Sequence, residues 1–477
     1  MLFNSIEFLL FLPAVFVLYW FVFNKNLKSQ NSLILVSSYV FYGWWDYRFL
    51  SLIFLSTVID YIIGLKIPRQ DSERGKKLLL WCSVLFNLSV LGFFKYYNFF
   101  VDSWVDLFRS IGYEIKSVWT LNIILPVGIS FYTFQTMSYT IDVYRKKLVP
   151  TKDFISFASF VSFFPQLVAG PIERASNLLP QILKTREFQY EQGIQGLRLI
   201  LWGMFKKVVI ADSLAPMVDN IFGNYQDLGG GTLWLGAIYF AFQIYCDFSG
   251  YSDIAIGTSK LFGFELMSNF KFPYFSRNIG EFWRRWHISL STWFRDYLYI
   301  PLGGSQEGKL KSVRNIFIIF LVSGFWHGAN WTFIFWGLFH AILFLPSFLL
   351  NTNRKFTSSI IAENSLLPSP KEFLQIGTTF LLVTIGWVFF RSETVVDSFI
   401  YLSKMMSNYA INSSLLAIIK NMIIIPIFIL VDYFVFKKNI LIKQDMKNEI
   451  IFYMFILIYV ISLIIGTENK SFIYFEF

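Results

Sequence analysis

Long uninterrupted runs of apolar residues recur along the whole chain. A run of about 20 apolar residues is long enough to cross the roughly 30 Å hydrocarbon core of a bilayer as a helix. The composition agrees, because 55% of the 477 residues are hydrophobic and only 15% are charged, whereas soluble domains carry about 25% charged residues. The runs are continuous and do not alternate, which argues against a β-barrel. The chain is therefore predicted to be an all-α polytopic membrane protein.

The apolar runs define the expected order of spans. Stretch 153–172 is apolar but interrupted by Pro165, Gly170 and Pro171, and it is predicted to be re-entrant, because broken backbone at membrane depth must be buried in protein. Segment 264–312 is basic and is predicted to form cytoplasmic or interfacial helices. With no repeat or flexible linker, residues 1–465 are predicted to be one membrane domain. The candidate spans are about 6–23, 31–45, 48–65, 78–98, 119–143, 196–222, 231–263, 313–326, 331–350, 374–391, 413–436 and 448–465.

Basic residues gather in the loops between these spans. The net charge of +10 therefore reports topology and not a nucleic-acid partner, because Lys and Arg accumulate in cytoplasmic loops. Clusters at 66–77 and 145–152 are expected in the cytoplasm, which places the N-terminus and the tail 466–477 outside. The apolar start lacks a basic region and a cleavage site, so it is interpreted as a retained first span. Cys82 and Cys246 lie in apolar segments and predict no disulfide framework.

The chain has only three histidines, His287, His327 and His340. Histidine takes and returns a proton near neutral pH. His327 lies in a Trp-rich and Gly-rich turn between two apolar runs, where an ionisable side chain is costly and usually functional. It is the candidate general base, although an interhelical hydrogen bond would also explain it. His340 is expected to support helix packing or to orient a neighbour.

The segment around His287 combines Trp and Arg side chains with polar residues. Guanidinium groups bind phosphate bidentately and stack on rings, so Arg284 and Arg285 could hold a phosphate-bearing or thioester-linked donor. An interfacial amphipathic helix with basic and Trp anchors is an equally good interpretation. Asp247 and Asp253 are expected to pair with these arginines. The sequence contains no P-loop, HExxH, GxSxG or metal-ligand cluster.

Several stretches together resemble the membrane-bound O-acyltransferase family, in particular the branch that contains the membrane component of alginate O-acetylation. The similarity runs nearly end to end. The stretches that carry it are Leu2–Ser5 with Glu7–Phe8, Leu125–Gln135, Pro165–Ile172, Phe282–Gly304 and Trp326–Ala329.

This resemblance implies a bundle of about 11–13 membrane-spanning helices, with re-entrant and amphipathic helices, around a funnel or tunnel. It implies that His327 is the essential histidine and His287 a second polar site residue. It implies a cytosolic donor, acetyl coenzyme A or a related acyl thioester, with no bound cofactor or metal. Further candidate donor- or substrate-binding residues are Trp283, Arg284, Arg285, Trp286, Asn330 and Asp296. The implied partners are membrane lipid and an extracytoplasmic SGNH-type acetyltransferase or esterase-like protein.

The last residues, Phe472 to Phe477, have the form FxYxxF. This pattern resembles the C-terminal motif of the small partner in teichoic acid D-alanylation, where the tyrosine is proposed to carry the acyl group. Tyr474 therefore becomes a candidate acyl relay, and an extended tail of this length can reach back roughly 25 Å. An interfacial aromatic tail is the alternative.

The predicted function is acyl transfer in a bacterial inner membrane, from a cytosolic thioester to an extracytoplasmic polysaccharide or cell-wall polymer. Asn330 or a backbone N–H is the candidate donor to the oxyanion. A transporter with a buried His and charge pathway is the main alternative, because broken segments occur in transporters. A non-catalytic scaffold is a third possibility, but it leaves the Trp-Arg-His segment unexplained.

Overall fold

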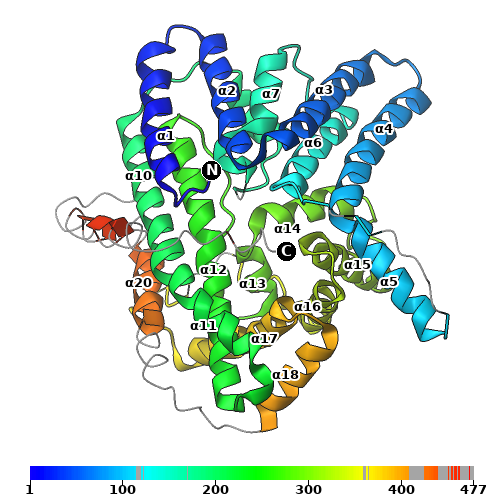
Figure 1. The fold of residues 1–477 in the computed structure, drawn as a ribbon, viewed down its shortest axis with the longest axis vertical. Coiled ribbons are helices and arrows are strands. Elements are labelled where there is room, and N and C mark those ends of the chain that lie inside the picture. The colour runs from blue at the N-terminus through cyan, green and yellow to red at the C-terminus, as the bar shows by residue number, and fades with distance from the viewer. Residues whose placement is uncertain are drawn as a thin grey trace. The chain divides into compact units, whose positions relative to one another are not determined.

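The computed structural model is all helical over the part of the chain that it describes (Figure 1). It describes residues 1–477 except 114–119, 122, 169, 358–360, 364, 408–423, 439–449, 451, 452, 455, 459, 462–471 and 473–477. The chain divides into two compact units, the first Met1–Gly196 with Ala255–Met267 and the second Leu197–Ile254 with Ser268–Phe477. The all-α prediction is confirmed.

The first unit contains nine complete helices within the described residues. They are α1 (Ile6–Val17), α2 (Leu27–Asp46), α3 (Leu50–Lys66), α4 (Glu73–Leu91), α5 (Tyr97–Ser110), α6 (Ile129–Tyr144), α7 (Phe154–Ser162), α8 (Phe164–Leu167) and α9 (Ala175–Ile182). Helix α7 packs on α2, and α6 packs on α3 and α4. The carboxylate of Asp60 is fully buried between these helices, where it accepts hydrogen bonds from Ser83 at 2.5 Å and Asn87 at 2.8 Å. Interhelical polar bonds of this kind hold membrane helices in register.

Helix α6 is shorter than the predicted span 119–143. The described residues just before it are not helical, and α6 begins only at Ile129. Pro126 is followed by Gly128, which adopts φ +75°, a left-handed conformation that glycine reaches without strain. This turn delays the start of the helix.

Stretch 153–172 is broken, as its prolines predict. Helices α7 and α8 are separated at Phe163, whose ψ of 104° leaves the helical region. The break precedes Pro165, which lies in the first turn of α8, where its missing N–H costs nothing. Every residue from Ser156 to Val168 is buried, as non-helical backbone at membrane depth requires.

The second unit begins at Leu197, within α10, and continues to the C-terminus, apart from 255–267. Helices α10 (Tyr190–Met204) and α12 (Gly230–Leu261) run through the unit boundaries. Helix α16 packs against α15, α17, α13 and α18. The remaining helices are α11 (Asp212–Gly223), α13 (Ile279–Arg285), α14 (Ile288–Phe294), α15 (Lys309–His327), α16 (Trp331–Leu349), α17 (Pro370–Arg391), α18 (Val395–Ser407) and α20 (Ile424–Lys438).

Four described helical stretches are long and apolar enough to cross a membrane: Leu27–Arg69, Glu73–Ser110, Trp331–Leu349 and Pro370–Arg391. Shorter apolar helices cover Ile6–Val22, Phe154–Leu167 and Ile425–Phe436. Parts of the predicted spans 413–436 and 448–465 lie outside the described residues. Helix α18 has no counterpart among the predicted spans, because its 13 residues are too few to cross a bilayer.

The prediction that Asp247 and Asp253 pair with the arginines near His287 is wrong. Asp253 binds the Lys206 ammonium at 2.7 Å, and Lys207 lies 2.8 Å from Asp247 and 2.9 Å from Asp212. Both lysines lie in the π-helical segment Phe205–Ala211, which places two consecutive side chains against α12. The sequence signal was present, because two adjacent lysines inside an apolar run need buried carboxylates.

Candidate functional site

His327 is the last residue of α15, and it is 3% exposed. Its imidazole lies among aromatic rings, with ring centroids at 5.1 Å from Trp326, 5.2 Å from Trp336 and 5.4 Å from Phe390. These rings come from α15, α16 and α17. The three helices therefore build an apolar cage around one ionisable side chain, a surrounding in which electrostatic interactions are stronger than in water.

Close packing between α15 and α16 holds this cage together. A Cβ atom added at Gly324 would lie 2.2 Å from the Phe333 carbonyl oxygen, and one at Gly337 would lie 2.3 Å from that of Phe320. Only glycine permits backbones to approach this closely, as in other membrane helix pairs. The three-residue connection 328–330 then brings Trp336 back over His327.

His287 enters the same cage from a different part of the chain. It precedes α14 and adopts φ 42° and ψ 55°, a left-handed conformation that is uncommon outside glycine. Hydrogen bonds on both sides hold this turn, from Lys271 N to Arg285 O at 3.0 Å and from Ile288 N to Asn269 O at 2.9 Å. The fully buried Asn269 side chain also accepts from Ser289 Oγ at 2.5 Å. The fold thus maintains a strained residue, which is typical of functional sites.

The rings of His287 and His327 are 6.1 Å apart, centroid to centroid. Because a ring nitrogen lies roughly 1 Å from its ring centroid and a hydrogen bond spans roughly 3 Å between heavy atoms, one oxygen atom beside the two rings can be within reach of both. Within the described part of the chain, neither ring nitrogen of His287 has a hydrogen-bond partner. Burial lowers the pKa of His287 to about 3, so its imidazole is neutral at physiological pH.

His340 lies on α16 and is fully buried. Its ring packs at 4.9 Å from Trp283 and 5.0 Å from Trp336. Trp336 contacts both His340 and His327, so the third histidine supports the cage through Trp336. This is the packing role expected for His340.

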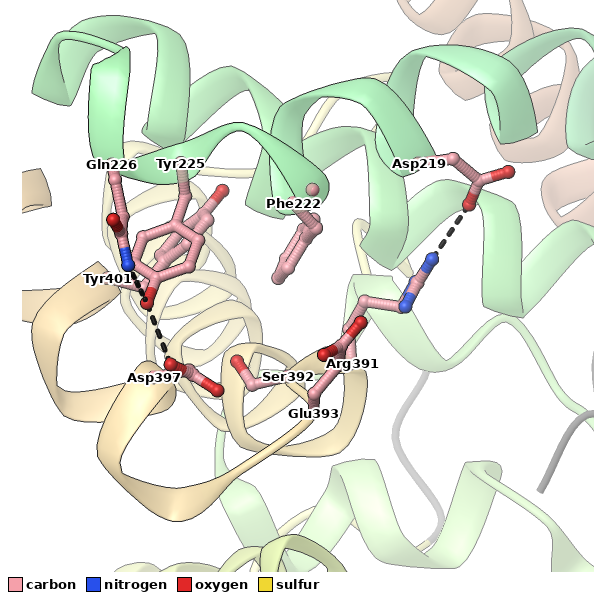
Figure 2. A pocket seen from close by; sticks show the side chains of 10 residues that line it. Asp219, Phe222, Tyr225, Gln226, Arg391, Ser392, Glu393, Asp397 and Tyr401 are labelled. Carbon is pink, nitrogen blue, oxygen red and sulfur yellow. Dashed lines mark hydrogen bonds and ion pairs between the residues drawn. The ribbon is translucent and has the colours of Figure 1, made fainter.

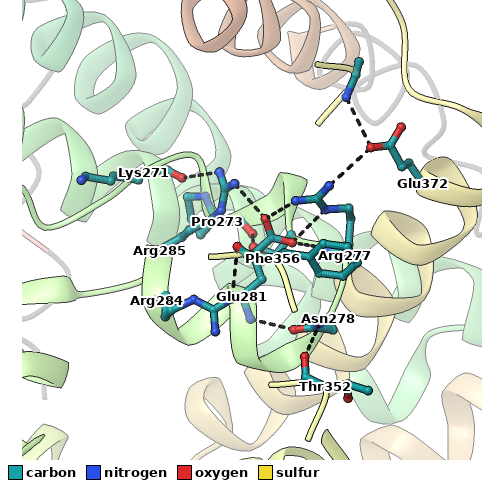
Figure 3. Close-up of polar contacts among 12 residues, drawn as sticks. Lys271, Pro273, Arg277, Asn278, Glu281, Arg284, Arg285, Thr352, Phe356 and Glu372 are labelled. Atoms are coloured by element: carbon teal, nitrogen blue, oxygen red, sulfur yellow. Dashed lines mark hydrogen bonds and ion pairs between the residues drawn. The ribbon is translucent and has the colours of Figure 1, made fainter. Parts of the chain in front are cut away.

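Two predicted donor-binding arginines take part in a network on α13 (Figure 3). Arg285 binds the Glu281 carboxylate at 2.8 Å and the Lys271 carbonyl at 3.1 Å. Arg284 donates to the backbone carbonyls of Asn353 and Phe356. Glu281 also binds Arg277 at 3.1 Å. These bonds tie α13 to the connection between α16 and α17.

The other predicted site residues have separate surroundings. Trp286 is fully buried, with its ring 4.9 Å from that of Trp387. Asn330 caps α16 by accepting from Thr332 N at 3.0 Å, and its amide donates to the Glu393 carbonyl at 2.9 Å. Asp296 accepts from its neighbour Arg295 at 2.7 Å. The structure thus brings His287 and His327 together, and Trp283 packs on Trp336 of the cage at 5.6 Å. It gives Asn330 and the arginines structural contacts.

The C-terminal segment reaches the same unit at Phe472. This side chain is fully buried, and its ring lies 4.4 Å from Tyr251 and 5.8 Å from Phe248. The Phe248 ring in turn lies 4.7 Å from His287. Tyr474 lies outside the described residues. One aromatic ring therefore separates the start of the FxYxxF motif from His287.

Sequence reasoning missed the aromatic residues that line the cage. Phe248, Trp336 and Phe390 come from three helices, and they resemble ordinary apolar residues in membrane spans. Only Trp336 carried a signal, because it follows His327 by nine positions in a segment rich in Trp.

Comparison with known proteins identifies the family of this chain. The model of the membrane-bound O-acyltransferase family, MBOAT, matches residues 49–359. The chain belongs to this family and is an acyltransferase.

Three of its relatives are named for the acylation of alginate, peptidoglycan or teichoic acid. A protein of Pseudomonas syringae named probable alginate O-acetylase AlgI is 44% identical over 398 residues, which cover 83% of this chain and 73% of the relative. A Helicobacter pylori peptidoglycan O-acetyltransferase is 37% identical over 424 residues, 83% of this chain and 78% of that protein. A Bacillus subtilis teichoic acid D-alanyltransferase is 30% identical over 293 residues, 57% of this chain and 70% of that protein.

Proposed function

We propose that this enzyme takes an acetyl group from a cytosolic thioester such as acetyl coenzyme A and passes it across the inner membrane to a hydroxyl of an envelope polymer. The supporting observation is the pair of buried histidines 6.1 Å apart inside the aromatic cage. The relatives support an O-acyl product, because their names specify acetylation of alginate and peptidoglycan.

In the proposed reaction, His327 accepts the proton of an entering hydroxyl as the new C–O bond forms at the thioester carbonyl carbon. The C–S bond breaks, and the proton on His327 passes to the leaving thiolate. A general base positioned in this way accelerates transfer by about 10²–10⁴-fold. His287, on the other side of the reacting oxygen, orients the hydroxyl or donates to the oxyanion.

Two routes for the acyl group are compatible with this chemistry. In the relay route, the Tyr474 hydroxyl attacks first, and the resulting acyl-tyrosine passes its group to an extracytoplasmic partner enzyme of the SGNH type. In the direct route, an acceptor hydroxyl reaches His327 itself. The burial of Phe472 one ring away from His287 favours the relay, because it brings the tail toward the reacting centre.

The test uses the full chain in nanodiscs with acetyl coenzyme A labelled in the acetyl group. Thiol release and acetyl transfer are measured for His327→Gln and for the matched variant His340→Gln, which changes a histidine of the same aromatic cluster. We expect His327→Gln to lose at least about 100-fold in rate and His340→Gln to retain most of the wild-type rate. Equal activity of the two variants would remove the general-base assignment.

Mass spectrometry of the C-terminal peptide tests the relay. Label on Tyr474 in the wild type, and loss of polymer acetylation in Tyr474→Phe, are the expected results. A fully active Tyr474→Phe enzyme with no labelled peptide would leave only the direct route.

A further inference from the structure

Asn269 is a fully buried residue beside the left-handed turn that carries His287. It makes three hydrogen bonds around this turn. Its backbone carbonyl accepts from Ile288 N at 2.9 Å, its side-chain Oδ1 accepts from Ser289 Oγ at 2.5 Å, and its side-chain Nδ2 donates to Ser252 Oγ at 3.0 Å. Two of these partners directly follow His287 in the chain. Asn269 therefore fixes the backbone that leaves His287 and ties it to α12.

Helix α12 contacts this turn through two side chains that lie one helical turn apart. The ring of Phe248 lies 4.7 Å from that of His287, in an edge-to-face arrangement with an interplanar angle of 86°. Ser252, four residues further along, accepts the bond from Asn269. Residues at i and i+4 lie on the same face of a helix. One face of α12 therefore contacts the imidazole directly and, through Asn269, the backbone that carries it.

An amide side chain suits this bridge because it combines a hydrogen-bond acceptor with a donor. The hydroxyls of Ser252 and Ser289 are both buried, and each residue is 1% exposed. An alanine in place of Asn269 would leave each of them with one partner fewer, and a buried polar group that loses its partner is costly. Bulk water cannot replace the amide at this depth. The bridge therefore depends on the Asn269 side chain.

The backbone conformation of His287 makes such support necessary. A residue other than glycine stays in the left-handed region only where its surroundings hold it there. Without the bridge the turn can relax, and the imidazole then moves relative to His327, whose ring lies 6.1 Å away. A misplacement of about 1 Å can cost about 100-fold in rate.

We propose that Asn269 is a positioning residue for acyl transfer, which acts by holding His287 at its distance from His327. The assignment rests on the proposed function, in which His287 contacts the reacting oxygen. Asn269 influences the rate only through the histidine that it holds. Its loss should therefore change the rate of the chemical step and leave binding of the donor almost unchanged.

A second group of polar side chains in the same unit provides a comparison. At the ends of α11, α17 and α18, Asp219 pairs with Arg391 at 2.7 Å, and Asp397 accepts from the Tyr225 hydroxyl at 2.8 Å (Figure 2). These bonds join the side chains of the group to one another. Tyr225→Phe therefore removes a hydrogen bond that does not involve the turn at His287.

The experiment measures thiol release from acetyl coenzyme A during the first turnover of the full chain in nanodiscs. Varying the donor concentration separates the rate at saturation from the concentration that gives half of that rate. Asn269→Ala should lower the saturated rate at least about tenfold and change the half-saturating concentration less than about twofold. Ser252→Ala, which leaves Asn269 in place and is less likely to disturb folding, should lower the saturated rate about two- to tenfold, the range that corresponds to one hydrogen bond.

Asn315→Ala and Tyr225→Phe are the matched controls. Asn315 is fully buried on α15 and donates to the carbonyls of Leu302 at 3.1 Å and Gly304 at 3.0 Å. It precedes His327 by 12 positions, roughly 18 Å along the helix. Asn315→Ala should lower the temperature of unfolding as Asn269→Ala does, because each removes a buried amide with two side-chain hydrogen bonds, but it should keep the saturated rate. Controls that lose as much rate as Asn269→Ala and Ser252→Ala would overturn the proposal.

A double-mutant cycle with His287→Gln tests whether Asn269 acts through His287. In the His287→Gln chain, Asn269→Ala and Ser252→Ala should each change the saturated rate by less than about twofold, because the side chain that they position is already absent. The same fold-loss with and without His287 would overturn the proposal, because it would leave Asn269 a purely structural role.

The cycle also separates this proposal from the proposed function. A wild-type chain that releases no thiol, or a His287→Gln chain as fast as the wild type, refutes the proposed chemistry at the histidines. A slowed His287→Gln chain together with a wild-type rate for Asn269→Ala refutes only the positioning role.

Discussion

Replacing Gly324 by alanine should disable the enzyme through the geometry of α15 and α16. The added Cβ would lie 2.2 Å from the Phe333 carbonyl oxygen, whereas non-bonded heavy atoms rest at about 3.5 Å. The helices must therefore separate by about 1 Å. Overpacking of this kind costs about 1–3 kcal/mol of stability.

The effect on activity should be larger than the effect on stability. His327 follows Gly324 by three residues on the same helix, so a shift of α15 moves the imidazole relative to His287. A misplacement of about 1 Å can cost about 100-fold in rate. The assay combines thermal unfolding in nanodiscs with the rate of thiol release from acetyl coenzyme A.

Gly377 on α17 supplies the matched control. No heavy atom lies within 4 Å of a Cβ built there. Gly377→Ala should leave the rate unchanged and raise stability by up to about 1 kcal/mol, because alanine is the better helix former. If Gly324→Ala unfolds and reacts like Gly377→Ala, close packing at Gly324 does not control the position of His327.

Two further predictions concern buried charge. Lys207→Met should lower the free energy of unfolding by about 3–5 kcal/mol, because it leaves Asp247 buried without its ammonium partner, and adding Asp247→Leu should recover much of that loss. Denaturation in detergent measures the stability of both variants. A double variant that is no more stable than Lys207→Met would contradict the pairing. Burial raises the pKa of Glu173 to about 7. Above about pH 4.5 the folded state therefore holds a proton that the unfolded state has lost. The free energy of unfolding should fall as the pH rises from 5 toward 7. Glu173→Gln should flatten this dependence in thermal unfolding scans, and an unchanged slope would show that Glu173 is not its source.

Local features of the chain were enough to predict that the protein is all helical and that a helix breaks near Pro165. The lengths of the apolar runs identified α2, α3, α16 and α17, because a helix that crosses a bilayer must satisfy its own backbone hydrogen bonds. Pro165 predicted the break near α8 for the same local reason. The span 119–143 was predicted too long, because the turn at Gly128 depends on one backbone dihedral within an apolar run.

Which residues of different helices contact one another depended on the tertiary structure. The sequence singled out His287 and His327, but 40 positions separate them, and their 6.1 Å spacing depends on how the turn before α14 packs against the end of α15. Asp247 and Asp253 were correctly expected to form ion pairs, yet which cations they meet depends on the rotation of α12 against the segment 205–211. Hydropathy contains no information on helix rotation, because a buried face and a lipid-facing one are equally apolar. The sequence therefore determined which residues are unusual, and packing decided which of them meet.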